Sequence, residues 1–541
     1  MVQIIQICKL FSFFLIFFLS SNLLNSNERN QFGNYLSWSY ARLKGDLPKV
    51  GEYYSDIDFR IISQPLLEEL FFESVTFEDW EKATEISKVL KKKDSNNFSA
   101  DLYLFVNDFL VNNKISESIQ NIDNQYFDIN FIKALLLWTN KLNKKKSKVE
   151  SVEDCIPLIC IHTGIFLMQE GKKAKSKVYF DELLKKNFSS HRIKELLFLN
   201  FLELKDEKTA SKIFDELSLN DMNLKKYEIG HFKKNRNFLN PVLSERDAIA
   251  EVFYNISSWY YQKNLYKYSA FFGKLSLRIR PDFNAMKLLL VSAYEQLGFE
   301  EISIKTVSKI KYNNPYFMKF LKIKTSLYEI IKRDDQEIID ELKVLAKNFP
   351  ENWEIKLLLA DKLRASEKYD ESISLYSDVI KSDSIDDRWV VFYSRGIAYE
   401  RLNKWHDAER DLKEAMRLEP NDPYVINYLA YSWLDRNINL NEALDLLKKA
   451  VELEPADGYI MDSLGWAYYL TNAIDKSVYY LEKAVSFLPN DATLNDHLGD
   501  AYWKLGRKEE AISQWKRVLI IKPKYKKKKN VIDKINNGLS K

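Results

Sequence analysis

Residues 457–523 read DGYIMDSLGWAYYLTNAIDKSVYYLEKAVSFLPNDATLNDHLGDAYWKLGRKEEAISQWKRVLIIKP, and they contain one pattern twice at an offset of 34. The pattern runs large, small, aromatic, then large, small, then a final proline. The first copy has Leu464, Gly465, Tyr468, Leu481, Ala484 and Pro489, and the second has Leu498, Gly499, Tyr502, Trp515, Val518 and Pro523. Self-similarity at such a period predicts stacked helical hairpins.

Each residue type in the pattern has a physical reason. Gly465 allows the two antiparallel helices of one hairpin to approach closely, and Ala484 leaves room for the next hairpin. Pro489 ends the second helix because it lacks an N–H donor and clashes with the preceding turn. Asp457 and Asp491 stand where the following helices need N-caps.

This pattern resembles the tetratricopeptide repeat family, which implies an all-α, right-handed superhelical solenoid of antiparallel helix hairpins. The resemblance extends over residues 246–525, where prolines recur near the repeat ends at 281, 315, 350, 420, 455, 489 and 523. One repeat carries an extra residue, which is expected in the turn DRNINLN at 435–441. Residues 34–245 are expected to form divergent hairpins of the same kind, or else an unrelated helical domain, with a boundary within 225–245.

Composition limits the class of protein. A chain of 541 residues is too long for one ordinary core, and 46% hydrophobic residues exclude wholesale disorder. The formal charge of +4 gives no general attraction to nucleic acid, so no nucleic-acid partner is expected. Cys155 and Cys160 are expected on different faces of one helix, as small core residues without a bridge.

Residues 1–26 are expected to lie outside the fold. Residues 10–19 read LFSFFLIFFL after Lys9, which has the length of a secretory signal and not of a spanning helix. The prediction is therefore an exported, periplasmic protein. An uncleaved membrane anchor over residues 4–24 is the alternative.

No motif for catalysis occurs in the sequence. It has no H-E-x-x-H, G-x-S-x-G or phosphate-binding glycine loop. His497, with Asp496 and Asp500 nearby, resembles a metal or acid–base cluster, but a polar patch on an interaction surface is the preferred interpretation. We expect no enzyme activity, cofactor or metal.

Residues 526–541 form a lysine-rich end that is expected to be a capping helix, because a repeat array has to cover its last apolar face. Attraction to anionic lipid or nucleic acid is the other interpretation. The run contains no interleaved arginine or aromatic residues that would read bases, which favours the capping helix.

The resemblance also implies a concave groove, lined by the first helix of each repeat, that binds protein segments. The positions carried over to this sequence are Tyr424, Asn427, Tyr428, Tyr431, Tyr459, Asp462, Ser463, Trp466, Tyr469, Asp496, His497, Asp500 and Trp503. Aromatic and hydrogen-bonding groups of this kind suit an interface, and packing between hairpins is the alternative for each aromatic residue.

The sequence therefore predicts a non-enzymatic scaffold or adaptor of the bacterial cell envelope that binds a protein or peptide partner in this groove. By family analogy, such a partner is an envelope protease or an assembly factor. The alternative function is a structural subunit of a membrane-anchored complex.

Overall fold

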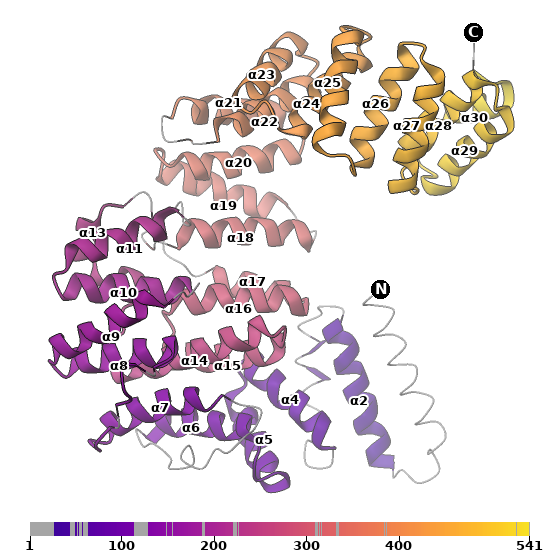
Figure 1. Ribbon diagram of the computed structural model, residues 1–541. Helices are drawn as coiled ribbons and strands as arrows, with labels where there is room; N and C mark the ends of the chain where they lie inside the picture. The colour runs from indigo at the N-terminus through magenta and orange to yellow at the C-terminus, as the bar shows by residue number, and fades with distance from the viewer. Residues whose placement is uncertain are drawn as a thin grey trace. The chain divides into compact units, whose positions relative to one another are not determined.

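The computed structural model describes residues 26–539 except 44–48, 51, 54–56, 58–62, 113–127, 148, 154, 187–189, 220–223, 225–226, 309–311, 313, 315, 332–334, 383–384, 386 and 526 (Figure 1). Within these residues every element is a helix, which confirms the predicted all-α class. The expected leader and the alternative anchor at 4–24 lie outside the described residues, except for Ser26. None of the described helices is both long enough and apolar enough to cross a membrane.

The chain divides into two compact units, Met1–Arg333 and Asp334–Lys541. The described helices of the first unit are α2 (Ser26–Leu43), α4 (Gln64–Thr76), α5 (Trp80–Lys93), α6 (Phe98–Asn112), α7 (Ile129–Leu142), α8 (Pro157–Gln169), α9 (Lys173–Lys185), α10 (His191–Glu203), α11 (Glu207–Leu219), α13 (Ile229–Lys234), the 3₁₀ helix η2 (Arg236–Leu239), α14 (Glu245–Gln262), α15 (Tyr266–Ile279), α16 (Asn284–Leu297), α17 (Glu300–Val307) and α18 (Phe317–Ile330).

Helices of the first unit do not pack only on their sequence neighbours. α14 packs on α7, and α15 packs on α4 and α6. Lys267 and Lys274 of α15 pair with Glu69 and Glu78 at 2.6 and 2.7 Å. The segment 225–245, where the sequence suggests a boundary, lies inside this unit. In a regular solenoid each hairpin contacts only its sequence neighbours, so long-range contacts of this kind would not occur.

In the second unit each helix packs mainly on its sequence neighbours. Its helices are α19 (Asp335–Asn348), α20 (Trp353–Ala365), α21 (Tyr369–Ile380), α22 (Arg388–Arg401), α23 (Trp405–Leu418), α24 (Pro423–Asp435), α25 (Leu440–Leu453), α26 (Gly458–Leu470), α27 (Ile474–Phe487), α28 (Ala492–Leu505), α29 (Lys508–Ile521) and α30 (Lys528–Asn537). From α20 onward, helices pair as hairpins, and each second helix packs on the first helix of the next hairpin. First helices also touch one another, as α24, α26 and α28 do.

Local sequence sets the ends of these helices. The Asp457 carboxylate accepts from the Tyr459 and Ile460 amides, and Asp491 caps α28 in the same way, as predicted. The second helices end two residues before Pro420, Pro455 and Pro489. The turns inside successive hairpins use left-handed residues, namely Asn403, Asn437, Asn472 and Gly506. Asn439 adds a second left-handed residue, in the turn predicted to hold the extra residue.

Close approach inside the hairpins depends on glycine. A Cβ added at Gly465 would lie 2.7 Å from Leu481 Cγ, and one at Gly499 would lie 2.6 Å from Trp515 Cδ1. Leu481 and Trp515 are fully buried. The repeated glycine therefore sets the separation of the two helices in each hairpin.

Cys155 and Cys160 form a disulfide, so the expectation that they do not bridge is wrong. That expectation placed both residues on one helix. α8 in fact begins at Pro157, and Cys155 precedes it, with the two Cα atoms 5.3 Å apart. This separation is within the range of disulfides, because the chain before the helix turns back toward its first turn.

Candidate partner-binding surface

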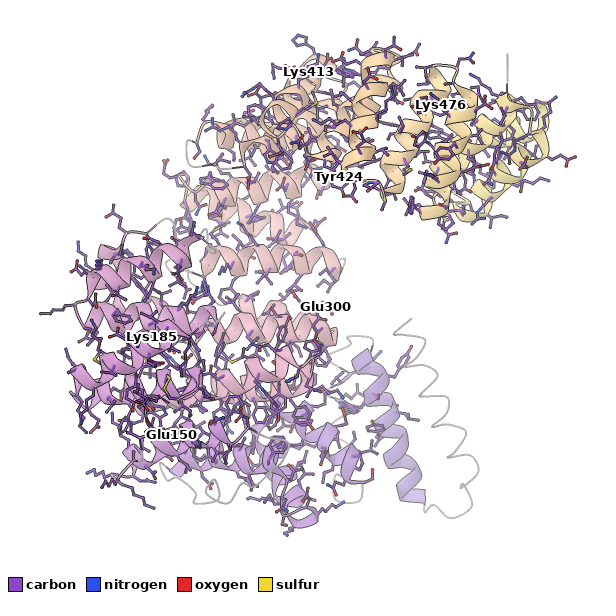
Figure 2. All side chains as sticks on the ribbon, viewed as in Figure 1. Glu150, Lys185, Glu300, Lys413, Tyr424 and Lys476 are labelled. Carbon is purple, nitrogen blue, oxygen red and sulfur yellow. A yellow bond between two sulfur atoms is a disulfide. The ribbon has the colours of Figure 1, made fainter. Side chains whose placement is uncertain are left out.

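We call the predicted groove positions on α24, α26 and α28 the first-helix surface. In the structure these positions fall into an exposed part, a half-buried part and a buried part. Tyr424 and Tyr459 are 51% and 55% exposed, near the starts of α24 and α26 (Figure 2 labels Tyr424). Asn427, Tyr428, Tyr431, Trp466 and Trp503 are half-buried, and Asp462, Ser463, Tyr469, Asp496, His497 and Asp500 are buried.

Tyr424 and Tyr459 occupy equivalent places in adjacent repeats. Each lies two residues after the aspartate that caps its helix, Asp422 or Asp457, and donates its backbone N–H to that carboxylate. Each tyrosine therefore follows a capped helix start, and about half of its surface is exposed to solvent.

The half-buried residues beside Tyr424 carry polar atoms. The Asn427 Oδ1 atom is buried and has no hydrogen-bond partner among the described residues. The Tyr428 hydroxyl lies 3.5 Å from Glu400, and burial, with the Glu400 charge, raises the pKa of Tyr428 to about 12. Burial also raises the pKa of Tyr431, and the negative charges of Asp462 and Asp435 raise it further. Both phenols therefore remain protonated donors at neutral pH.

The buried part is a polar cluster between α26, α28 and α30. His497 Nδ1 lies 3.0 Å from both carboxylate oxygens of Asp462. The Trp466 ring stacks on His497 with centroids 4.2 Å apart and on Tyr469 at 4.5 Å. Several residues predicted to meet a partner thus bind one another across the repeat interface.

Charges in this cluster shift the titration of His497. Burial alone would lower its pKa, but the charge and hydrogen bond of Asp462, with the charges of Asp496 and Asp500, outweigh burial and raise the pKa. Lys534 of α30 lies 2.8 Å from Asp496 and 2.7 Å from Asp500. The sequence analysis missed this contact, since the lysine-rich end gives no signal for which lysine turns inward.

Similar pairs join other first helices of the unit. Arg436 at the end of α24 lies 2.9 Å from Glu400 of α22 and sits over the Trp405 ring at 4.1 Å. Together with His497–Asp462 and Lys534–Asp496, this contact gives pairs between α22 and α24, between α26 and α28, and between α28 and α30. Within the described residues, no group of three or more His, Cys, Asp or Glu side chains is arranged to hold a metal.

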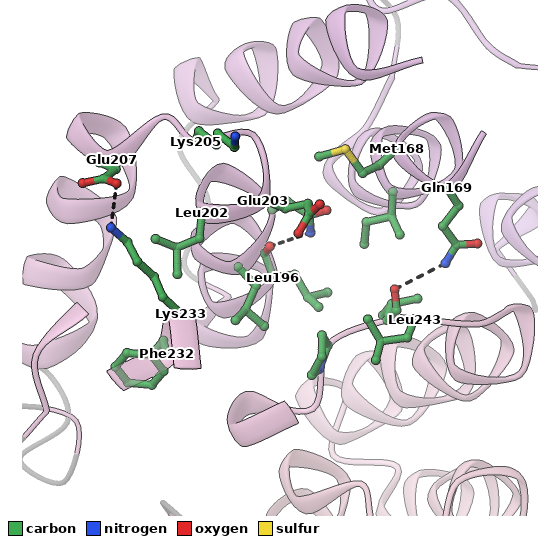
Figure 3. A pocket seen from close by; sticks show the side chains of 15 residues that line it. Met168, Gln169, Leu196, Leu202, Glu203, Lys205, Glu207, Phe232, Lys233 and Leu243 are labelled. Carbon is green, nitrogen blue, oxygen red and sulfur yellow. Dashed lines mark hydrogen bonds and ion pairs between the residues drawn. The ribbon is translucent and has the colours of Figure 1, made fainter. Parts of the chain in front are cut away.

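A separate cavity lies in the first unit. It has a volume of about 540 Å³ between α8, α10, α13 and the segment 241–243 (Figure 3). Its walls are largely apolar, with Met168, Leu196 and Phe232 among them. Lys233 and Glu207 at the edge pair with each other at 2.6 Å (Figure 3). The sequence analysis did not predict this cavity, because its walls come from helices whose periodicity looks like ordinary core.

Comparison with known proteins agrees with the hairpin geometry. The tetratricopeptide repeat family matches residues 393–457 and again residues 492–525. The protein therefore carries tetratricopeptide repeats, as the sequence resemblance predicted. Repeats of this family make protein–protein interaction scaffolds, which is the general class to which the second unit belongs.

Solved structures of repeat proteins are similar in part. MamA from Desulfovibrio magneticus RS-1 is 18% identical with a TM-score of 0.29, over 32% of this chain and 97% of MamA. YrrB, titled a TPR protein with an unusual peptide-binding site, is 16% identical with a TM-score of 0.29, over 36% of this chain and 97% of YrrB. TTC0263, a thermophilic TPR protein of Thermus thermophilus, is 21% identical with a TM-score of 0.29, over 34% of this chain and 98% of its own. No curated protein matches this chain.

Proposed function

We propose that this protein is a non-enzymatic scaffold of the bacterial cell envelope that binds a segment of a partner protein on the exposed part of the first-helix surface. The observation that supports this proposal is the pair of exposed tyrosines, Tyr424 and Tyr459, which lie at equivalent positions of adjacent repeats. Tyrosine supplies a large contact area at a small cost in conformational entropy, and it is enriched among the residues that dominate interface energies.

Two phenol groups of α24 beside Tyr424 suit a peptide backbone. Tyr428 and Tyr431 keep their protons and can donate. We therefore propose a bound segment with apolar side chains for the aromatic rings and main-chain carbonyl groups that can accept from these phenols.

Export is the second part of the proposal. The apolar leader at residues 10–19 supports it, and so does the Cys155–Cys160 disulfide, because disulfides form and persist mainly in oxidising compartments. An envelope protease or an assembly factor is the class of partner we propose. N-terminal sequencing of the protein from its own cells should begin after the apolar run, whereas an intact Met1 in the membrane fraction would favour the anchored subunit instead.

The binding proposal is tested by capture from the envelope fraction. We expect the mature protein to retain a partner that the Tyr424→Ala/Tyr459→Ala double variant loses. Tyr479→Ala is the matched control, because Tyr479 is 52% exposed but lies on the second helix α27. Equal capture by all three proteins would refute the assignment to the first-helix surface.

A further inference from the structure

The C-terminal helix α30 is held on the last repeat by the ion pairs of one lysine and by an apolar contact. Lys534 Nζ lies 2.8 Å from Asp496 Oδ1 and 2.7 Å from Asp500 Oδ1, and the exposures of these two carboxylates are 4% and 10%. The Trp515 indole also donates to Asp500 at 3.0 Å. Lys534 is thus the cation that compensates two buried negative charges on α28.

The remaining attachment of α30 is small. Within this helix Val531 is fully buried and Ile535 is half-buried, and Leu539, which follows the helix, packs against the same cluster around Trp515. Gly538 lies directly against Trp503, where an added Cβ would overlap the indole ring. A helix of 10 residues has little stability of its own, so α30 depends on these contacts to stay folded.

The segment that leads into α30, together with the first turn of the helix, disfavours attachment. Its described lysines are exposed, and no ion pair within the described residues joins them to a carboxylate. These lysines are Lys522, Lys524, Lys527, Lys528 and Lys529. Like charges held this close repel one another, and the repulsion is relieved when the segment can extend.

α30 covers positions that are equivalent to predicted groove positions of the preceding repeat. At the offset of 34, Asp500 corresponds to Trp466 and Trp503 corresponds to Tyr469. We propose that α30 is a displaceable occupant of the first-helix surface, and that a partner helix with an apolar residue three positions before a lysine takes its place over Asp496 and Asp500. This inference rests on the proposed function, since it describes how the last segment of the same surface becomes available.

Hydrogen exchange of the full chain tests whether α30 detaches by itself. We expect the amides of α30 to exchange at least about tenfold faster than those of α28, because a weakly attached element opens without its neighbours. Lys534→Gln should accelerate exchange in α30 further, while α24 and α25 stay unchanged. If α30 exchanged at the same rate as α28 and α29, it would be an integral part of the repeat and the inference would be overturned.

Displacement is tested with a synthetic peptide of residues 524–541 as the probe. It should bind the full chain saturably and accelerate exchange in the chain's own α30. The same peptide with Lys534→Gln should bind at least about tenfold more weakly, whereas Lys529→Gln, at an exposed position, should change little.

The Lys534→Gln protein provides the sharpest result. Its weakened α30 should let it bind the wild-type peptide more tightly than the wild-type protein does, which a misfolded variant would not do. Absence of peptide binding by both proteins would refute the inference. The assignment of Tyr424 and Tyr459 would still stand, because neither residue takes part in this measurement.

Discussion

His497 of α28 and Asp462 of α26 form a buried pair, with His497 Nδ1 3.0 Å from both oxygens of the carboxylate. The pair joins the first helices of two consecutive repeats, and Trp466 lies stacked on the imidazole. Asp496 and Asp500 of the same helix and Lys534 of α30 complete the charged surroundings. One titratable group therefore links the repeat interface to the aromatic part of the first-helix surface.

The C-terminal repeats should lose stability as the pH rises above neutrality. The folded-state pKa of His497 is raised above its ordinary value of 6.5. Its contribution is therefore fully present below that value and is lost as the pH rises through the folded pKa. The protection of residues 458–505 from hydrogen exchange, corrected for the intrinsic rise of exchange with pH, should fall as the pH rises from 6.5 through the folded pKa of His497 and should then level off.

His497→Gln should remove this pH dependence. His406→Gln is the matched control, because His406 is exposed on α23 and has no such pair. A wild-type protein whose C-terminal repeats become more protected as the pH rises would contradict the charged state assigned to His497.

Gly499→Ala should destabilise the last hairpin by about 1–3 kcal/mol, the usual cost of overpacking, because the new Cβ would lie 2.6 Å from Trp515 Cδ1. The loss should concentrate in α28 and α29 if hairpins interact mainly with their neighbours. Gly230→Ala, where the added carbon meets nothing within 4 Å, is the control. Uniform loosening of the second unit would argue against a stack of separate hairpins.

Arg192→Ala should destabilise the first unit by about 3–5 kcal/mol, since it leaves buried carboxylates unpaired. The Arg192 guanidinium donates to Glu195 at 2.9 Å and to Glu251 at 3.0 and 2.8 Å, and it also donates to the carbonyl groups of Leu239 and Asn240. Urea unfolding of the variant measures the loss. Lys194→Ala, which breaks the half-exposed pair with Glu216, should change stability by less than about 1 kcal/mol.

Thiol labelling should show that Cys155 and Cys160 are bridged in the mature protein. Labelling of the unfolded protein should be absent without a reductant and should occur at both residues after reduction. Two free thiols in protein isolated from its own cells would remove the disulfide as support for export.

The sequence predicts the second unit well because its contacts are local. Gly465 meets Leu481 within one hairpin, and the aspartates at 457 and 491 cap the helices that directly follow them. These interactions recur at one period, so the pattern exposes them. In the first unit Lys267 pairs with Glu69 across 198 residues, and no period marks such a contact.

The burial of Asp496 and Asp500 could not be predicted from the sequence either. The repeat pattern places both residues on the first-helix surface, where a partner could reach them. Both carboxylates pair with Lys534 of α30, a helix that packs through Val531 and lies outside the repeat pattern. The disulfide was missed for a related reason, because it depends on α8 beginning at Pro157 and not before Cys155.

Site-specific photo-crosslinking in the native cell shows which face of the second unit meets a partner. A photoreactive phenylalanine analogue would replace Tyr424, Tyr459 or Tyr479 in otherwise wild-type protein, at positions of similar exposure. We expect a shared adduct with one partner protein from positions 424 and 459 and no adduct from position 479. An adduct from position 479 with none from 424 or 459 would contradict partner binding on the first-helix surface.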